Sequence, residues 1–250
     1  MPVAADLVAF ASLNMPDADT GTSGGGIDLD RRVDFTPLAA NDDIEVISNN
    51  AGDTQNCTIE ARLASGAIVS ETKALTGTTA AIFSNLGVVE RVLKVELASD
   101  AIGTITVRRS VAGATLRTIP VGERGFMAIF RKCASSGAQE DFYCKLFLKN
   151  THGSQALLSA LVKQNADPQA RVTHLLAAAV NDSASVANRK TVPAAADTQD
   201  PDTFDDTDKA VPGTDLGFGA AIGVWLRLRL LASDPAFNSS YTVELAGQST

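Results

Sequence analysis

Short segments in which apolar and polar residues alternate recur along the chain. In Cys57-Thr-Ile-Glu-Ala-Arg-Leu63 the odd-numbered residues are apolar and the even-numbered ones are polar. Leu93, Val95 and Leu97 repeat the pattern, with Lys94 and Glu96 between them. Successive side chains of a β-strand point to opposite faces, so this period of two predicts strands with one buried and one solvated face.

Similar segments extend the pattern on both sides. Residues 43–50, 67–75, 104–109 and 125–130 are further candidate strands, and Ala64-Ser-Gly66 is typical of a hairpin turn between two of them. Short strands separated by roughly ten residues, with Gly, Asp and Asn between them, favour a β-sandwich. We therefore predict a first sandwich domain over residues 31–133, opened by a short strand at 32–36.

The strand pattern restarts after a small-residue linker at 134–139. In the segment 141–150, Tyr143, Lys145, Phe147 and Lys149 share one side of the predicted strand. Further strands are expected in the rest of the chain, at 156–164, 171–178, 222–231 and 240–245. The alanine-rich run 177–180 stays undecided, because alanine favours helix. Residues 140–250 are thus a second β-sandwich domain, interrupted by a long acidic loop at 181–219.

The first thirty residues fit neither domain. Their apolar residues are too few to form a core of their own, and the stretch 17–26 is rich in Gly and Asp, which do not hold regular structure by themselves. We interpret residues 1–30 as an extended N-terminal arm that becomes ordered against a neighbouring subunit. The predicted fold class is all-β, with two Ig-like or jelly-roll-like β-sandwich modules and this arm.

Composition narrows the function classes. The chain has 250 residues, of which 45% are hydrophobic, and a mean hydropathy of +0.07, so it can bury a sizeable core. The net charge is −8, and the 21 basic residues are scattered singly or in pairs. Nucleic-acid binding normally requires a basic patch, so no nucleic-acid partner is expected. No apolar run reaches the length of a membrane span, and Asp6 interrupts the apolar start, so we expect no membrane partner and synthesis in a cytoplasm.

Cysteine and histidine usage gives no sign of a metal centre. Cys57, Cys133 and Cys144 are an odd number without regular spacing, which is unlike a secreted disulfide framework. We interpret them as reduced thiols, with a bridge between subunits as the alternative. His152 lies in a turn-like sequence and His174 in a predicted strand, and neither has a partner at zinc-ligand spacing.

Three segments match functional patterns only in part. Gly21-Thr-Ser-Gly-Gly25 has the form of a nucleophile elbow, but it lacks the preceding strand that the motif requires. The acidic tract 197–208 favours a solvated loop, with cation binding as the alternative. Trp225 with Arg227 and Arg229 suggests either ordinary packing or a sugar-stacking surface. We predict no catalytic, cofactor-binding or metal residues and no cofactor, so the chain is not expected to be an enzyme.

Several segments also resemble a known kind of protein. Residues 43–55, 74–79 and 102–107 are similar to Ig-like modules of tailed-bacteriophage virion proteins. Matching segments over the remaining chain, from residue 14 to residue 246, are 14–25, 147–151, 166–168, 187–193, 222–225 and 241–246. These motifs are turns and strand edges rather than catalytic signatures. The resemblance therefore implies a kind of protein, without its place in the particle, and it identifies no active-site residues.

The resemblance implies a structural role in a virion. The expected function is a capsid decoration or cement protein that binds the major capsid protein and copies of itself, as a homotrimer, in a virion assembled in the host cytoplasm. A tail, neck or baseplate component is the first alternative. A module that binds carbohydrate on a host surface is the second.

Overall fold

The computed structural model describes residues 2–33, 38, 40–134, 137–199, 203–232 and 240–248. Within these residues the fold is all-β, as the sequence predicted. The helical segments described there are single 3-10 turns, η1 (Ala4–Asp6), η2 (Ser84–Leu86) and η3 (Ala195–Asp197). The chain divides into two compact units, which we call unit 1 (Met1–Asp28 with Ile129–Thr250) and unit 2 (Leu29–Ala128).

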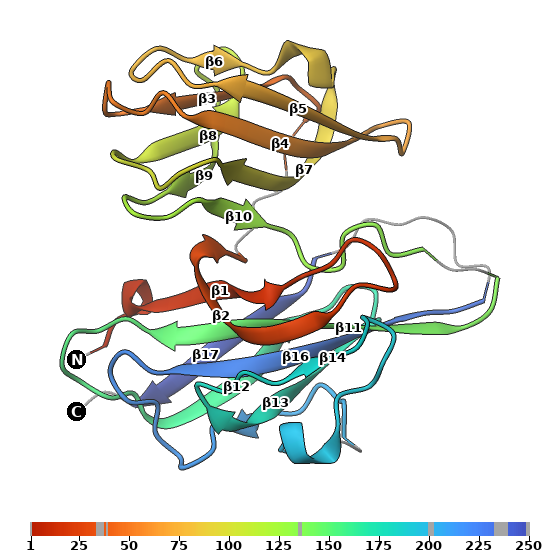
Figure 1. The fold of residues 1–250 in the computed structure, drawn as a ribbon. Coiled ribbons are helices and arrows are strands. Elements are labelled where there is room, and N and C mark those ends of the chain that lie inside the picture. The colour runs from red at the N-terminus through yellow and green to blue at the C-terminus, as the bar shows by residue number, and fades with distance from the viewer. Residues whose placement is uncertain are drawn as a thin grey trace. The chain divides into compact units, whose positions relative to one another are not determined.

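Unit 2 is a β-sandwich (Figure 1). One sheet has the order β10 (Gly125–Met127), β7 (Val89–Leu97), β4 (Asn56–Leu63) and β5 (Ile68–Ala74), and the other has the order β6 (Ala81–Ile82), β3 (Ile44–Ser48), β8 (Ile105–Arg109) and β9 (Thr115–Ile119). The alternating apolar residues of β4 and β7, among them Ile59 and Val95, meet Ile44 and Val107 of the second sheet in one core. The period of two in β4 and β7 therefore corresponds to a sheet face that is buried in the core.

The hairpin predicted around residues 64–66 is confirmed. β4 and β5 are antiparallel, with Arg62 opposite Ile68 and Asn56 opposite Ala74. Strand β5 ends its sheet, and none of its residues is fully buried. The first strand predicted at 32–36 mostly lies outside the described residues, and Arg32 is instead the last residue of β2 (Ser23–Arg32).

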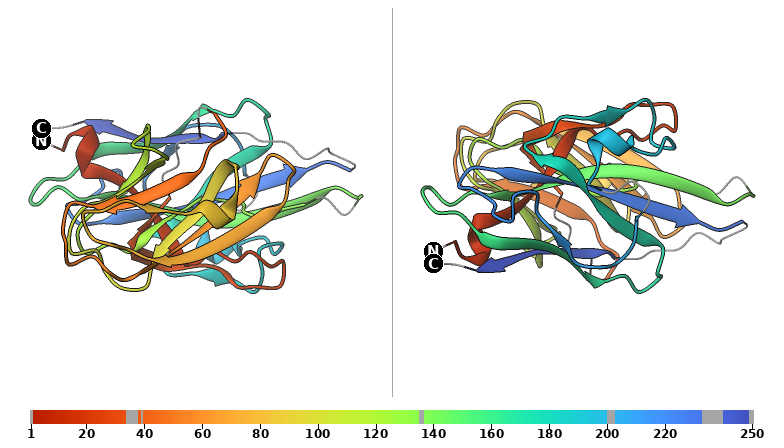
Figure 2. Two further views of the ribbon diagram at one scale, coloured as in Figure 1. Left: turned by 90° about the horizontal axis from the view of Figure 1, so that it is seen from above. Right: turned by 90° about the horizontal axis from the view of Figure 1, so that it is seen from below.

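Unit 1 has a larger sheet with the order β13 (Val172–Val180), β16 (Ala221–Leu230), β11 (Glu140–Asn150), β1 (Leu7–Asn14) and the first part of β2, up to Asp28. Strand β14 (Ser185–Val186) also pairs with this part of β2. Strands β11 and β16 run side by side over ten paired residues (Figure 2). The undecided run 177–180 belongs to β13. A three-stranded sheet of β15 (Lys209–Ala210), β12 (Leu158–Ala166) and β17 (Thr242–Gln248) completes the unit.

The predicted N-terminal arm contains β1 and most of β2, and its residues up to Asp28 are part of unit 1. Strand β1 lies between β11 and β2, with Leu7 opposite Asn150 and Ala11 opposite Leu146. Phe10 packs with Phe147 and Ala221 in a buried cluster. Six of the eight residues of β1 are apolar, but they do not alternate with polar ones, because an inner strand is covered by neighbours on both sides. One of these neighbours, β11, lies far away in sequence.

The domain limits differ from the predicted ones at both ends. Unit 2 ends at Ala128, so the segment 129–133 belongs to unit 1 rather than to the first sandwich. Residues 135 and 136 of the predicted linker lie outside the described residues. The predicted loop 181–219 contains β14, η3 and β15, and it buries Phe204, Val211 and Leu216. Much of this loop is therefore part of the packed body of unit 1.

Candidate functional site

The most unusual polar group described in unit 1 is Lys145, in the middle of β11. Its exposed fraction is 0%. Its Nζ donates to the backbone oxygens of Gly25 and Ala184, each at 3.2 Å, and contacts Oδ1 of Asp182. A lysine is almost never fully buried unless it is paired, so this carboxylate partner is expected on physical grounds.

Two aromatic rings complete the surroundings of this lysine. Its Nζ lies 4.9 Å from the ring centroid of Phe147 and 5.3 Å from that of Trp225, distances at which a cation is attracted by the ring face. Both rings are fully buried. Burial lowers the pKa of Lys145, because the ammonium group loses its hydration, and the contact with Asp182 opposes this effect. The lysine is thus shielded from solvent, and its neutral amine is favoured more than it is in water.

Local backbone geometry holds Asp182 in place. The preceding Asn181 has a left-handed φ of 57°, and its side chain and backbone both bond to Ala221. Oδ2 of Asp182 accepts the backbone N–H of Ala184 at 3.0 Å, which leaves Oδ1 for the lysine. The chain therefore turns directly after β13 and presents one carboxyl oxygen to β11.

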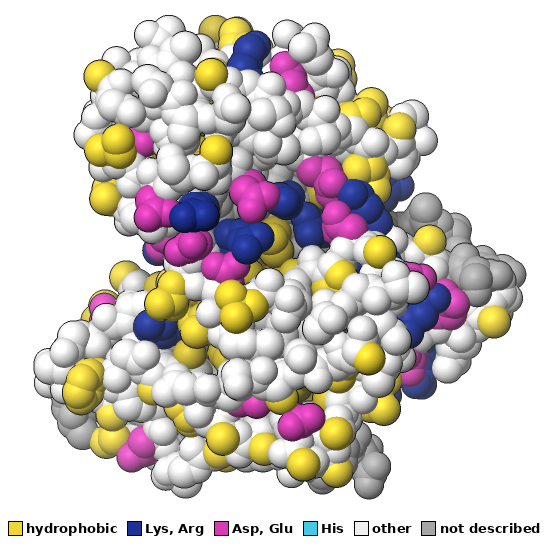
Figure 3. Space-filling model, in the orientation of Figure 1, with side chains coloured by type: hydrophobic (Ala, Val, Ile, Leu, Met, Phe, Trp, Pro, Cys, Tyr) yellow, Lys and Arg dark blue, Asp and Glu magenta, His cyan; other side chains and the backbone are white. Residues whose placement is uncertain are grey.

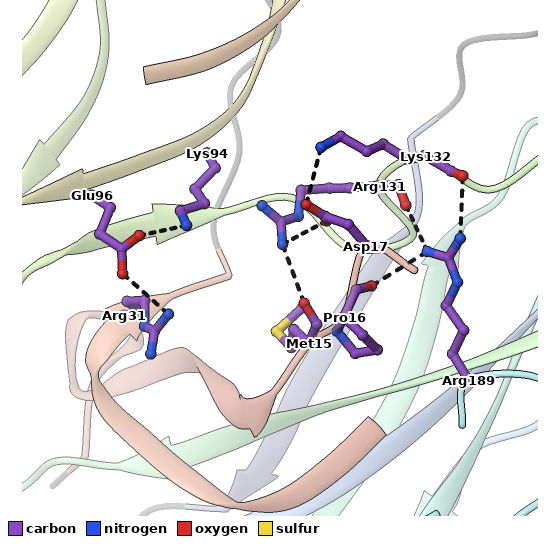
Figure 4. Close-up of polar contacts among 9 residues, drawn as sticks. All are labelled: Met15, Pro16, Asp17, Arg31, Lys94, Glu96, Arg131, Lys132 and Arg189. Carbon is purple, nitrogen blue, oxygen red and sulfur yellow. Dashed lines mark hydrogen bonds and ion pairs between the residues drawn. The ribbon is translucent and has the colours of Figure 1, made fainter. Parts of the chain in front are cut away.

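A second polar cluster in unit 1 ties the β1–β2 connection to the segment 131–132 (Figure 4). Arg189 donates to the backbone oxygens of Arg131 at 2.8 Å and Lys132 at 3.2 Å. Arg131 pairs with Asp17 at 2.9 Å, and Lys132 reaches the other oxygen of Asp17 at 3.1 Å. Arg131 and Arg189 are both buried. Because each guanidinium is held by fixed carbonyls and carboxylates, we interpret this cluster as a structural clamp.

Unit 2 has ion pairs of its own. Figure 4 also shows Glu96 on β7 between Arg31, at 3.4 Å, and Lys94. These side chains are partly exposed, so such pairs contribute little to stability.

Asp53 is the best-bonded buried acid described in unit 2. It accepts hydrogen bonds from Ser48 Oγ at 2.5 Å and from the backbone N–H groups of Ile102 at 2.8 Å and Gly103 at 2.9 Å. Burial alone raises the pKa of Asp53, but the hydrogen bonds outweigh it and hold this pKa below its ordinary value. Asp53 thereby fixes the loop that leads into β8.

Ser23, the serine of the elbow-like motif, is buried inside β2. Its Oγ donates to the backbone oxygen of Tyr143 at 3.0 Å. A strand, rather than a helix, continues after it. Ser23 thus belongs to a sheet rather than to an extended arm, and its hydroxyl bonds β2 to β11.

The acidic tract 197–208 is only partly described, because residues 200–202 lie outside the described residues. In the described part, Oδ1 of Asp205 accepts the Lys209 ammonium at 2.7 Å and two bonds from Thr207. Burial raises the pKa of Asp205, but these bonds outweigh it and lower the pKa to about 2. No group of three or more metal-ligating side chains occurs in the part of the chain that the structure describes.

The two histidines have different surroundings. Nδ1 of His152 accepts the backbone N–H groups of Ser154 and Gln155, so His152 stabilises a turn. His174 is buried on β13, and its Nδ1 lies 3.2 Å from the hydroxyl of Tyr241. Burial lowers the pKa of His174, and Lys209 lowers it further, while Asp205 opposes them.

The aromatic platform considered for sugar binding does not exist. Trp225 has an exposed fraction of 0%, and Arg227 and Arg229 are engaged with Phe204 and Asp141. All three cysteines are free thiols within the chain. Burial raises the pKa of Cys57 and of Cys133 to about 12, and that of Cys144 to about 11, so none of them is a reactive thiolate at neutral pH.

Exposed apolar side chains lie at one tip of unit 2. Ile102 is 56% exposed and Val121 is 62% exposed. Their loops run side by side, because Gly122 N–H donates to Ala101 O at 2.9 Å and Ala101 N–H donates to Glu123 O at 3.0 Å. We call Ile102 and Val121 the apolar tip. Figure 3 shows further hydrophobic side chains scattered over one face of the molecule. Single exposed apolar residues of this kind are ordinary on protein surfaces.

Sequence reasoning missed Lys145 as a special position, since it placed this residue on one side of a predicted strand without deciding whether that side is buried. Lys145 lies directly opposite Trp225 in the β11–β16 ladder, and Tyr143 and Phe147 flank it on the same side. Three large aromatic residues around one lysine are the signal for burial. This signal can be recognised only once the register of β11 and β16 is known.

The comparisons with known proteins give no relatives. No protein-family model matches the chain, and no curated protein or solved structure is significantly similar to it. Within the described residues, no helix has the length and apolar character needed to cross a membrane.

Proposed function

We propose that the protein is a non-enzymatic structural component of a tailed-bacteriophage virion, which decorates and cements the capsid by binding the major capsid protein and further copies of itself. Support comes from the turn and strand-edge segments that resemble Ig-like modules of such virion proteins, which run from residue 14 to residue 246. A closed homotrimer fits the symmetry of a shell, because decoration proteins bind at its symmetry axes.

The observation that carries the proposal is a contrast between polar side chains, which are bonded within the fold, and exposed apolar side chains. The groups that suggested chemistry in the sequence, such as Ser23 and His152, are engaged in holding strands and turns together. In contrast, the apolar tip projects two hydrophobic side chains into solvent from adjoining loops. Adjacent exposed apolar residues favour binding to another protein surface.

Strand β5 offers a second means of binding. It ends its sheet, so its outer backbone edge is available to another chain. Glu71 and Lys73 lie on this strand and discourage unspecific pairing of edges. A capsid subunit with matching charges is therefore a better partner than an arbitrary strand.

Particles of the phage that encodes the chain provide the test. Immunogold labelling of intact virions, followed by separation of heads from tails, is expected to place the protein on heads. Particles that lack it are expected to assemble and package DNA, but to break at lower temperature or under osmotic shock, and added protein restores resistance. Robust heads with missing or defective tails would instead support a tail, neck or baseplate component.

The oligomeric state is a separate measurement. Multi-angle light scattering of the purified protein is expected to give a trimer. A monomer at high concentration, together with isolated copies on the particle, would contradict the trimer while leaving the location on heads to be decided by the labelling.

A further inference from the structure

Lys145 and Asp182 form a buried amine–carboxyl pair that binding to a capsid does not require. They come from β11 and from the turn after β13, 37 residues apart in sequence, and both lie in unit 1. The lysine side chain is completely buried, and that of Asp182 is 13% exposed. Placing two full charges in such a site is costly, so the pair is a poor way to add stability if it stays ionic.

The contacts of the lysine orient its nitrogen. An ammonium group has three donors, and here three oxygens surround it: Gly25 O, Ala184 O and Asp182 Oδ1. When one proton moves to the carboxylate, the two remaining N–H groups can stay on the two carbonyl oxygens. The nitrogen lone pair then points towards the carboxyl group of Asp182.

The two oxygens of the Asp182 carboxyl group have different partners. Its Oδ2 accepts the backbone N–H of Ala184 at 3.0 Å, while Oδ1 faces the amine. A fixed N–H donor at Oδ2 stabilises negative charge that develops on this oxygen during attack at the carboxyl carbon. Well-oriented intramolecular groups reach effective molarities on the order of 10⁵–10⁸ M, which is enough to overcome the low reactivity of a carboxylic acid.

We propose that Lys145 and Asp182 condense into an intramolecular isopeptide bond that links β11 to the turn after β13. Nζ of the neutral amine attacks Cγ of the protonated carboxyl group, and the new C–N bond forms as the negative charge moves to Oδ2. The bond between Cγ and Oδ1 then breaks, and Oδ1 leaves as water with its own proton and one proton from Nζ. The ion pair thus becomes a neutral amide plus one water molecule, without any oxidant or co-reactant.

The surroundings favour this reaction at Lys145 over other lysines. The rings of Phe147 and Trp225 exclude water from the pair, and burial shifts the lysine towards its neutral, nucleophilic form. The pair Lys190–Asp19 has a comparable contact, at 2.8 Å, but its side chains are 34% and 43% exposed to solvent. Contact alone does not produce an amide in water, so Lys190 serves as an internal control.

Mass spectrometry of the denatured wild-type protein tests the proposal. The intact protein is expected to be lighter than its sequence by one water molecule. Trypsin cannot cleave after an amide-linked Lys145, so the digest is expected to contain peptide 133–149 joined to peptide 172–189, while cleavage after Lys190 proceeds normally. The linked species is expected to replace the two separate peptides after prolonged incubation of the folded protein.

Asp182→Asn is the matched variant, because it preserves shape and offers the same attack at Cγ. It is expected to give the same linked peptides with loss of ammonia instead of water. Lys145→Met is expected to show neither loss. Since the decisive measurement uses the wild-type chain, a variant that does not fold cannot hide the result.

Two results would overturn the proposal. Cleavage after Lys145, with both peptides at their full masses, would mean that the pair remains ionic. Loss of water from peptide 172–189 alone would indicate cyclisation of Asp182 with its own backbone, and no bond to the lysine. Neither result bears on the capsid-binding proposal, which rests on different residues.

Discussion

The indole of Trp225 occupies the space into which a side chain at Gly24 would extend. An ideal Cβ at Gly24 would lie 2.5 Å from Cη2 of Trp225, and the φ of Gly24 is +91°. The glycine in β2 and the tryptophan in β16 are therefore a matched pair. The glycine-rich stretch, which resembles a flexible linker in sequence, provides the room for a buried aromatic residue.

The Gly24→Ala substitution is expected to destabilise unit 1 by about 2–4 kcal/mol, because it adds a steric overlap and a strained left-handed backbone. Urea unfolding followed by tryptophan fluorescence measures the loss, since Trp225 is the only tryptophan. Gly153→Ala is the control, as no atom lies within 4 Å of its ideal Cβ. Equal effects of both changes would show that Gly24 is not constrained by Trp225.

Asp53 is expected to make unit 2 sensitive to acid. Its pKa is lower in the folded protein than the ordinary value near 4, so its stabilising effect is present above that value and is lost as pH falls through the folded pKa. Asp53→Asn should lower the stability at neutral pH and flatten its fall in acid. Chemical denaturation of both proteins from pH 7 down to about pH 2.5 measures this. An unchanged acid profile in the variant would contradict it.

His174 is expected to make unit 1 less stable at mildly acidic pH. Its folded-state pKa is lowered, so the folded protein favours the neutral ring, and stability is lost as pH falls below the ordinary value of about 6.5. His174→Gln should reduce this loss between about pH 7.5 and 5. His152→Gln is the control, because the only other histidine lies in a turn. A pH profile that changes only in the control variant would refute the assignment.

The apolar tip is expected to matter for binding but not for folding. Replacing Ile102 and Val121 together with serine should weaken binding to heads by roughly tenfold or more, since each buried aliphatic side chain contributes about 1.5–3 kcal/mol. The thermal midpoint should stay within a few degrees of the wild type. Sedimentation of the protein with heads that lack it measures the binding.

Val111→Ser is the control for the tip. Val111 is 84% exposed and lies beyond the opposite end of β8 from Ile102. The Val111→Ser substitution should leave binding to heads unchanged. If all three positions behave alike, the contact surface lies elsewhere on the protein.

Much of unit 2 could be predicted because its signal is local. Cys57, Ile59 and Ala61 alternate with polar residues, and all three are buried in β4. The hairpin to β5 follows from a short turn within the same stretch. A strand with one buried face and a nearby partner carries its structural information in a few adjacent residues.

Strands β1 and β2 could not be predicted in the same way. Phe10 is buried by Phe147 and Ala221, which lie far along the chain, and Gly24 is required by Trp225. Nothing near these residues in sequence reports those contacts. A segment that is covered mainly by distant parts of the chain looks like an arm until the sheet is assembled.

By itself, the sequence determined that this is an all-β protein built from short strands, because periodicity and turn residues act over a few neighbouring positions. Only the tertiary structure decided that β1 is an inner strand and that Lys145 is buried against Asp182. The physical reason is that burial depends on what covers a face. In a sheet, the covering residues come from strands that the chain reaches much later.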